Sequence, residues 1–356
     1  MLYDRVFLKL IINYIYLTME KLEMSFATVT PHGIIVPDVV DKKTSKRYIN
    51  WGEDNKLPNY LWDNYLSCSN LQSIVNTITD FVIGEGVEHD FSQSDFEDNV
   101  SKWVLDYTLF GGFAVEGLRN THGDIVQLNY INIMNVRVDE ELTTAFISNN
   151  WGSWSGKNIT ELPLFDANAK QAHFLYYFRG NITRNINPIP MYIASLKSIE
   201  ILNNVKNFHL NNLNNGFTAS AIINLNDGTI KTRELKEIKD QLEAKYTGSS
   251  NAGKFILMNG GDKEHAATVE RLDADNFGDL YQTLDKSSKE DLFVAFRINP
   301  ILVGVNVQTG FSKEEFENAF ALYNSTVITP LKKTLIKHFS KLGVKINFKD
   351  FKIKWA

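Results

Sequence analysis

Apolar residues in the second half of the chain recur every three or four positions over three long segments, which predicts amphipathic helices. The first runs from about Met191 to Asn215 and ends where Gly216 can supply a left-handed cap. The second ends at Asn299-Pro300, because proline pushes the residue before it out of the helical region. The third contains Pro330, which should kink it. The apolar faces comprise Tyr192, Leu196, Ile199, Leu202, Val205 and Phe208; then Phe277, Leu280, Tyr281, Leu284, Leu292 and Phe296; and then Phe316, Phe320, Tyr323, Val327, Leu331, Leu335 and Leu342.

Residues 217–272, between the first two helices, form an insert with its own pattern. Ala219–Leu225, Lys254–Met258 and Thr268–Leu272 predict strands, and Thr232–Tyr246 predicts a charged helix. A β-α-β unit this small needs support from neighbours to be stable. Two helices that carry a small domain form a stalk, and a first helix of about 25 residues would be roughly 37 Å long. This arrangement indicates a part of an assembly rather than an enzyme pocket.

The first half of the chain has a mixed α+β pattern. Helical spacing follows Pro58 and recurs twice more, and the turn at residues 121–124 predicts a hairpin. Apolar and polar residues alternate after residue 343, which predicts an edge strand over 343–356. The expected helices and strands are a helix through Leu71–Phe81, a helix over Asp95–Phe110, and strands over Phe113–Arg119, Ile125–Ile131, Val136–Val138 and His173–Phe178.

Composition fits a folded chain in a reducing compartment. The 356 residues are 44% hydrophobic and 12% aromatic, which excludes a disordered tail or a collagen-like fibre. Cys68 is the single cysteine, so a disulfide scaffold is excluded. The net charge of −5 argues against a protein that grips phosphates over a large basic face, although it is compatible with loose contact to DNA.

Residues 1–24 form an uncertain N-terminal extension. Apolar residues are dense up to Leu17, but Lys9 interrupts them and no small-residue cleavage site follows. The segment is too short and too broken to cross a bilayer. Met19 and Met24 lie just downstream, so a gene start placed too early, or a frayed helix, is favoured over a membrane anchor.

Two patterns could carry chemistry. Gly248–Phe255 nearly matches a phosphate-binding loop with Lys254, but Phe255 replaces the hydroxyl residue and a strand, not a helix, is expected to follow. A flexible loop is the favoured interpretation. Glu85, Glu88, His89 and Asp90 are expected in a turn after a helix, where solvated charges are favoured over a metal site. The sequence therefore predicts no cofactor, no metal and no catalytic residues.

The order of these segments resembles the portal proteins of tailed bacteriophages, from about Trp51 to Leu342. No single motif is diagnostic, and the resemblance lies in their order and spacing. The segments that carry it are Trp51–Pro58; Phe110–Glu116; Gly123 with Leu128–Ile131; Ile189-Pro190 before the first long helix and Asn215-Gly216-Phe217 after it; Phe296–Gly304; and Thr329-Pro330-Leu331.

The resemblance implies an α+β, portal-like fold with a wing, a two-helix stem, a small α/β clip, a tunnel loop and a long kinked tunnel helix. The implied parts are a wing over 25–187, stem helices over 188–216 and 273–297, a clip over 217–272, a tunnel loop and tunnel helix over 298–342, and a C-terminal strand over 343–356. A helical crown after the tunnel helix is not evident, which is a departure from the family pattern.

The same resemblance assigns roles to residues. The tunnel loop that would touch DNA is expected at Val305, Asn306, Val307, Gln308, Thr309, Gly310 and Lys313. Packing of stem helices between subunits is expected at Leu196, Ile199, Leu202, Val205, Leu280 and Leu284, so that Leu202→Asp should disrupt assembly. A surface of the clip for partner docking is expected at Lys231, Arg233, Lys236 and Lys239.

The expected function is that of a subunit in a homo-oligomeric ring of twelve at a capsid vertex, through which double-stranded DNA is packaged and ejected. The expected partners are the chain itself, DNA passing through without sequence specificity, the terminase, and capsid and neck or adaptor proteins, with no membrane. The ring would reside in the virion and assemble in the bacterial cytoplasm. Two alternatives stay open, namely a nucleotide-binding enzyme that uses Lys254 and another phage head or tail structural protein.

Overall fold

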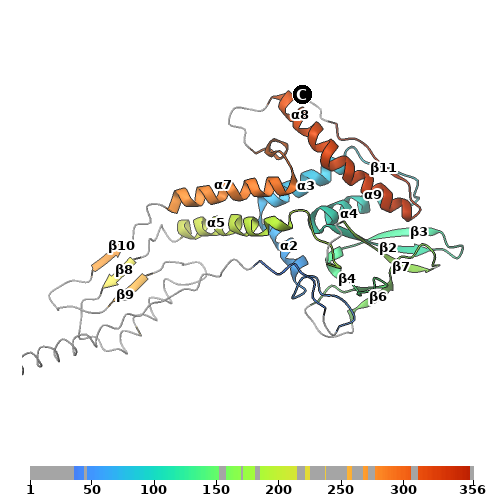
Figure 1. Cartoon of the computed structure of the whole chain (residues 1–356), viewed down its shortest axis with the longest axis horizontal. Helices are drawn as coiled ribbons and strands as arrows, with labels where there is room; N and C mark the ends of the chain where they lie inside the picture. The colour runs from blue at the N-terminus through green and yellow to red at the C-terminus, as the bar shows by residue number, and fades with distance from the viewer. Residues whose placement is uncertain are drawn as a thin grey trace, which may run out of the picture. The chain divides into compact units, whose positions relative to one another are not determined.

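The computed structural model describes residues 36–43, 46–151, 158–169, 171–180, 185–214, 221–224, 237, 255–258, 268–271, 277–305 and 312–352 (Figure 1). The chain divides into two compact units. The main unit comprises residues 34–203 and 286–356, and the small unit comprises residues 1–33 and 204–285. Helices α5 (Leu196–Asn214) and α7 (Phe277–Phe296) each belong partly to one unit and partly to the other.

Three helices open the main unit. They are α2 (Leu57–Ser67), α3 (Ser69–Ile83) and α4 (Phe96–Phe110). Pro58 lies in the first turn of α2, where its missing N–H costs nothing. Helix α4 ends at Gly111, whose φ of 83° suits glycine. The predicted helices of this half are confirmed.

The described residues of the main unit form three small sheets. In the first, β2 (Gly112–Arg119) lies between β3 (Ile125–Ile131) and β7 (His173–Arg179), and both pairings are antiparallel. In the second, β4 (Val136–Val138), β5 (Thr144–Ile147) and β6 (Thr160–Pro163) are paired in chain order. The predicted hairpin and strands are confirmed, but β5 and β6 were not predicted.

The third sheet joins two distant parts of the chain. Strand β11 (Ile346–Phe348), within the predicted C-terminal strand, pairs antiparallel with β1 (Val87–His89). The turn expected around Glu88 and His89 is therefore wrong. Those residues lie in a strand because β11 supplies hydrogen-bond partners that local sequence cannot indicate.

The core of the main unit forms where α4 and α9 (Thr329–Lys341) meet on β2. The indole of Trp103 donates to the carbonyl oxygen of Ala114 over 2.9 Å. The ring of Phe339 stacks on Phe113 at 5.9 Å and lies 5.3 Å from Trp103. These side chains are fully buried, so one helix from each end of the chain covers the same strand.

The third long helix is interrupted rather than continuous. It consists of α8 (Lys313–Tyr323), a π-helical segment η5 (Asn324–Ile328) and α9. Pro330 lies in the first turn of α9. The disturbance predicted at Pro330 is thus present as a widened turn just before it, since proline cannot donate the i→i−4 hydrogen bond.

Helix α7 ends earlier than the sequence predicts. The expected end was Asn299-Pro300, but the last helical residue is Phe296, and Arg297 has a φ of 53°. Asn299 instead caps the short 3₁₀ helix η4 (Pro300–Val303), because its side chain accepts from the N–H of Ile301. The first long helix likewise begins at Leu196, after a 3₁₀ turn over Ile193–Ser195, and not at Met191.

The small unit contains β8 (Ala221–Asn224), β9 (Phe255–Met258) and β10 (Thr268–Arg271), in the order β10-β8-β9. The three predicted strands are confirmed. Strands β8 and β9 are parallel, so a crossover joins them, as expected for a β-α-β unit. Of the helix predicted over Thr232–Tyr246, only Glu237 is described, and it is helical.

Candidate functional site

The predicted stem face of α5 is buried within one copy of the chain. Leu196, Ile199, Leu202 and Val205 are between 0% and 7% exposed. On its other side, α5 meets α2, because the amide of Asn203 donates to Asn64 and to Ser67. These apolar residues therefore contribute to the core of the chain itself. Leu284 is partly buried, and the side chain of Leu280 lies outside the described residues.

Polar contacts hold α5 against α7. The hydroxyl of Ser198 donates to the carboxylate of Asp291 over 2.9 Å, and that of Ser195 donates to the carbonyl oxygen of Asp291. Within the small unit, the ring of Phe208 lies 4.5 Å from that of Tyr281. The two helices therefore lie side by side (Figure 1).

The chain folds back tightly at the end of α7. Tyr323 of α8 donates to the carbonyl oxygen of Phe296, and Tyr192 stacks on the ring of Phe296 at 5.0 Å. Burial raises the pKa of both tyrosines, so they stay neutral hydrogen-bond donors. The phenol of Tyr192 donates to the carbonyl oxygen of Leu109. One aromatic cluster thus joins the start of α5, the end of α7 and α8.

Both ends of the expected tunnel loop are fixed. On one side Gly304, with a φ of 75°, closes η4 before Val305. On the other side Ser312 and Glu315 form a reciprocal capping box at the start of α8. Lys313 pairs with Glu317 at 3.8 Å. Asn306, Val307, Gln308, Thr309 and Gly310 lie outside the described residues.

Motifs that are far apart in the sequence meet in the main unit. The indole of Trp51 donates to the carbonyl oxygen of Pro188 over 3.1 Å. A Cβ at Gly111 would lie only 2.2 Å from the carbonyl oxygen of Ile189, so a larger residue cannot fit there. The segments Trp51–Pro58, Phe110–Glu116 and Ile189-Pro190, which carried the family resemblance, therefore form one junction.

A buried arginine organises this junction, and sequence reasoning missed it. Arg137 is fully buried between the rings of Trp51 and Trp151, at 5.4 and 4.8 Å. Its guanidinium donates to the side chain and the carbonyl oxygen of Asn55. Burial lowers its pKa to about 10, so it is still charged at neutral pH. Arg137 is flanked only by two valines in the three-residue strand β4, so no local sequence pattern predicts that its side chain is buried.

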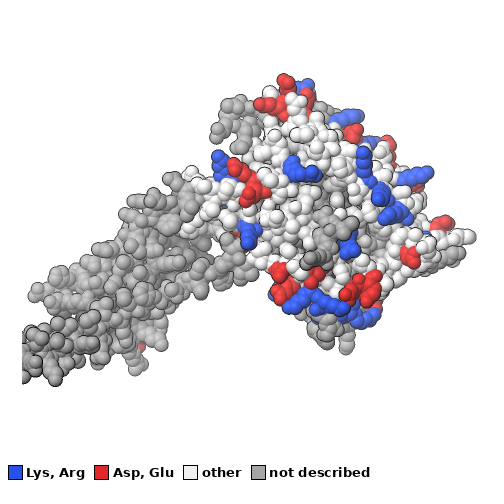
Figure 2. All heavy atoms as spheres, in the orientation of Figure 1, with Lys and Arg blue, Asp and Glu red and all other residues white. Residues whose placement is uncertain are grey.

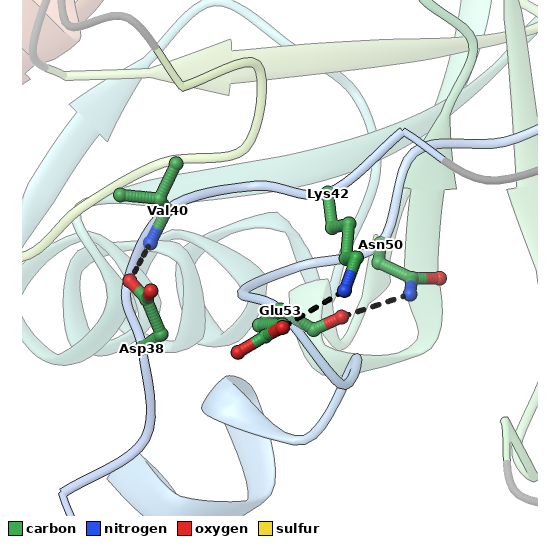
Figure 3. Close-up of polar contacts among 5 residues, drawn as sticks. All are labelled: Asp38, Val40, Lys42, Asn50 and Glu53. Atoms are coloured by element: carbon green, nitrogen blue, oxygen red, sulfur yellow. Dashed lines mark hydrogen bonds and ion pairs between the residues drawn. The ribbon is translucent and has the colours of Figure 1, made fainter.

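The segment before α2 is held by a set of polar contacts (Figure 3). Lys42 pairs with Glu53 at 2.8 Å, and the amide of Asn50 donates to the carbonyl oxygen of Glu53. Close by, Asp41 accepts from the N–H groups of Ile186 and Asn187, both at 2.7 Å. The segment that follows β7 is thereby tied to the segment that precedes α2.

A second buried group that the sequence did not indicate is Asp106 on α4. It is 3% exposed, and it accepts from the hydroxyl of Tyr130 and from the N–H of Ile133, both at 3.2 Å. Burial raises the pKa of Asp106 to about 8, despite these two hydrogen bonds. Asp106 thereby ties α4 to β3 and to the turn that follows β3.

The patterns considered for catalysis or metal binding gain no support. Lys254 lies outside the described residues, but strand β9 begins directly after it, whereas a phosphate-binding loop leads into a helix. No group of three potential metal ligands is present among the described residues. His89 contacts the ring of Phe96 at 4.8 Å instead.

In the described part of the chain, no helix is long and apolar enough to cross a membrane. The expected clip residues Lys231, Arg233, Lys236 and Lys239 are not described.

Comparison with known families decides between the remaining alternatives. A profile of the family described as "Phage portal protein" matches residues 93–354. The chain belongs to the phage portal protein family. The match includes the junction at Gly111, helices α5 and α7, the fold-back after α7 and the whole of α8 and α9. Proteins of this family are in general structural components rather than enzymes.

Solved structures show the same mixed helix-and-sheet fold. A chain from the virion of the native gene transfer agent (GTA) particle is 12% identical, with a TM-score of 0.56 and coverage of 86% of both chains. A chain from the neck of that particle, computed with C12 symmetry, has a TM-score of 0.52 at 13% identity and covers 82% of this chain and 84% of its own. An HK97-family phage portal protein from Corynebacterium diphtheriae has a TM-score of 0.52 at 11% identity, over 80% of this portal-family chain and 93% of its own.

Two curated relatives from Rickettsia, both named only as uncharacterized proteins, share sequence over a shorter stretch. The protein from Rickettsia bellii is 30% identical over 123 residues, and that from Rickettsia felis is 28% identical over the same length. Each alignment covers 34% of this portal-family chain and 30% of the relative. The chain thus spans less than a third of the length of these relatives.

Proposed function

We propose that the chain is one subunit of a portal ring at a capsid vertex, which forms the channel for packaging and ejection of the genome. The observation that carries this proposal is the family match over residues 93–354. The fold supports it independently, since 86% of the chain follows a chain of the GTA virion despite 12% identity.

The ring would contain twelve copies. The C12 symmetry of the similar neck structure supports this number. The described residues also include apolar side chains that a neighbour could cover. Val294 of α7 is 74% exposed, Leu322 of α8 is 67% exposed and Leu66 of α2 is 58% exposed. A closed ring with one repeated interface buries such residues without leaving a free surface.

The channel lining would come from the loop between η4 and α8. Val305 to Gly310, together with Lys313, is the segment that we assign to contact with DNA. Support comes from the fixed ends of the loop, at Gly304 and at the Ser312–Glu315 capping box. A loop with rigid ends and short polar side chains suits sliding contact without base reading.

The proposed partners are those of a packaging machine. Double-stranded DNA would pass through the ring, the terminase would dock on the small unit, and capsid and neck or adaptor proteins would bind around it. Lys231, Arg233, Lys236 and Lys239 are the docking residues that we propose on the small unit. The ring would assemble in the bacterial cytoplasm, reside in the virion and have no catalytic activity of its own.

Negative-stain electron microscopy with native mass measurement tests the proposal directly. The expected result is a closed ring of twelve copies with a central hole wide enough for duplex DNA. A compact monomer at all concentrations, with ATP hydrolysis that Lys254→Ala abolishes, would overturn the proposal in favour of the enzyme.

A further inference from the structure

The last part of the described chain is strongly basic although the whole chain is acidic. Residues 332–352 contain seven lysines and one acidic residue, Asp350. The chain as a whole carries a net charge of −5. The net charge of the chain therefore gives no indication of the potential along α9 and on either side of β11, where these lysines lie. Figure 2 shows Lys and Arg side chains gathered over this region.

The fold turns four of these lysines outward and buries the residues between them. Leu335 and Phe339 of α9 face the core, whereas Lys333, Lys337 and Lys341 are exposed. These three lysines follow one another at intervals of four and so share one helix face, with a rise of about 6 Å between neighbours. Lys345 lies just beyond the turn at Gly343 and is also exposed. Lys333, Lys337, Lys341 and Lys345 are called the lysine face below.

The lysine face forms no ion pair with a carboxylate within the described chain, and the one carboxylate bonded to it, that of Asp90, accepts from the backbone N–H of Lys345. Lys349 and Lys352, which follow it, pair with Glu88 and Glu85. Lys332 is buried and contacts Asp350. By contrast, none of the four lysines of the lysine face makes an ion pair with another described residue. The basic residues at its margin are thus paired, and those at its centre are not.

A neighbouring histidine reports the same positive potential. His338 lies between Lys337 and Lys341 in the sequence, and its ring hydrogen-bonds the hydroxyl of Tyr176 at 2.5 Å. Its pKa is lowered to about 4, first by burial and then by the charges of Lys341 and Lys337. The histidine is therefore neutral at physiological pH, and the charge of the face comes from lysine alone.

Repulsion within the lysine face costs stability. Like charges four residues apart on a helix destabilise it. Attraction to the helix C-terminus offsets this cost for Lys341 but not for Lys333, since that effect is limited to the last turn. A solvated helix face commonly mixes both signs of charge, and this one does not. A single-sign face of this kind suits an anionic partner.

We propose that the lysine face is a contact site for the phosphate backbone of double-stranded DNA. The composition of the face favours nucleic acid over an acidic protein, because protein interfaces are depleted in lysine and enriched in aromatic residues and arginine. No large apolar side chain is highly exposed on α9 or β11. Lysine presents a point charge on a flexible stem, which suits phosphates but does not read bases.

This site is distinct from the proposed channel loop. It belongs to α9 and to the turn between α9 and β11 in the main unit, and it requires no assembled ring in order to bind. A local basic face can bind phosphates even where the net charge of the chain is negative. The choice of double-stranded DNA rests on the proposed function, whereas the anion site itself rests on the charges alone.

The experiment compares variants of the full chain. Binding to a fluorescent random-sequence duplex of about 30 base pairs is measured by anisotropy from about 50 to 200 mM salt, the range over which such contacts change most. The test variant is Lys333→Gln/Lys337→Gln/Lys341→Gln, and a matching Lys→Arg triple keeps the charge. The control is Lys42→Gln/Lys43→Gln/Lys56→Gln, which removes three exposed lysines that pair with Glu53, Glu140 and Asp54. Native mass and thermal melting are recorded on the same samples.

The expected result is at least about tenfold weaker binding for the test variant and a slope of log K against log salt that is smaller by about 3, since each lost phosphate contact removes about 0.9. The control and the arginine triple should bind as the parent does. If the test variant melts early, each single Lys→Gln should lower the slope by about 1.

Equal loss in the test and control variants would overturn the site, because binding would then depend on total charge. Competition by poly-glutamate as strong as that by DNA at equal charge would assign the face to an acidic protein instead. Failure of ring formation in the native mass measurement would contradict the proposed function but not the lysine face. The two proposals are therefore tested separately.

Discussion

The guanidinium of Arg297 donates a hydrogen bond over 3.4 Å to the carbonyl oxygen of Thr326. This oxygen cannot accept the ordinary helical bond from residue 330, because Pro330 has no N–H. Ser325 and Thr326 also turn their hydroxyls back to the carbonyl oxygen of Leu322. Arg297, the residue just after α7, thus supplies a donor at the widened turn of the third long helix.

The backbone of Arg297, with a φ of 53°, provides a test of the strain in the turn after α7. Glycine at 297 should be more stable than alanine by roughly 1 kcal/mol, because only glycine adopts positive φ without cost. Both variants lose the guanidinium, so the comparison isolates the backbone. Urea unfolding measures the difference. Equal stabilities would show that the turn after α7 relaxes when the side chain is removed.

Asp106 should make the protein less stable as the pH rises. Its pKa is about 8 in the folded protein and near its ordinary value, about 4, in the unfolded chain, so the folded state holds the proton over that interval. Stability is full below about pH 4 and falls as the pH rises to about 8, by at most about 1.4 kcal/mol per pH unit.

Asp106→Asn should remove this dependence. The amide of the asparagine can accept from the N–H of Ile133 and donate to the hydroxyl of Tyr130. Both hydrogen bonds are therefore kept without a group that can become charged in the core. Urea unfolding from pH 5 to 9 compares the two proteins. A parallel decline in both proteins would exclude Asp106 as its source.

His338 should act at the opposite end of the pH range. Its pKa is about 4 in the folded protein and near 6.5 in the unfolded chain, so the unfolded chain takes up the proton first. The stability from this group is present above about pH 6.5 and is lost as the pH falls to about 4. Thermal melts of His338→Gln should show a smaller loss over this interval than the parent. An unchanged loss would assign it to carboxylates.

Leu202 and Val294 should separate folding from assembly. Leu202 has no exposed surface, so Leu202→Ala should lower the free energy of unfolding by about 2–5 kcal/mol. Leu202→Asp should therefore unfold the single chain, and any loss of ring assembly would follow from that unfolding. Val294 is 74% exposed, so Val294→Asp should leave the melting temperature of the monomer unchanged but prevent ring formation, as read by native mass. Rings formed normally by Val294→Asp would exclude it from the subunit interface.

Deletion of residues 305–309 should leave the ring intact and impair DNA packaging. The aromatic cluster at Phe296 and the capping box at Ser312 lie outside the deletion, so the flanking helices keep their anchors. Electron microscopy and an in vitro packaging assay measure the two effects. Failure of the rings to form would show that the loop is not the tunnel loop that we assign.

Local patterns predicted much of the fold because they reflect local physics. The apolar spacing of α5, with Leu196, Ile199 and Leu202, indicated both the helix and its buried face. The turn before Asp124 indicated the β2–β3 hairpin. The order of such elements was sufficient to indicate the family. The sequence could not predict which residues cover the buried face of α5, because periodicity does not distinguish a core within one chain from a contact between chains.

Features that depend on distant partners were missed. Strand β1 is three residues long and exists because β11 pairs with it. Arg137 is buried only because Trp51, Asn55 and Trp151 surround it. The end of α7 at Phe296 depends on Tyr323 from the next helix. The lysine face could have been found from the sequence, since a charge count by segment reveals it, whereas the net charge of the chain conceals it.

The β1–β11 pairing also determines when the main unit can complete its folding during translation. Asp90, just after β1, bonds to the N–H of Lys345, which lies 255 residues later in the chain. At ribosomal speeds of roughly 5–20 residues per second, β1 waits about 13–50 s for its partner. The small unit is translated during this delay, while the main unit lacks a strand and the helix α9 that covers its core. A nascent chain therefore cannot present a finished main unit to a neighbour before β11 has been synthesised.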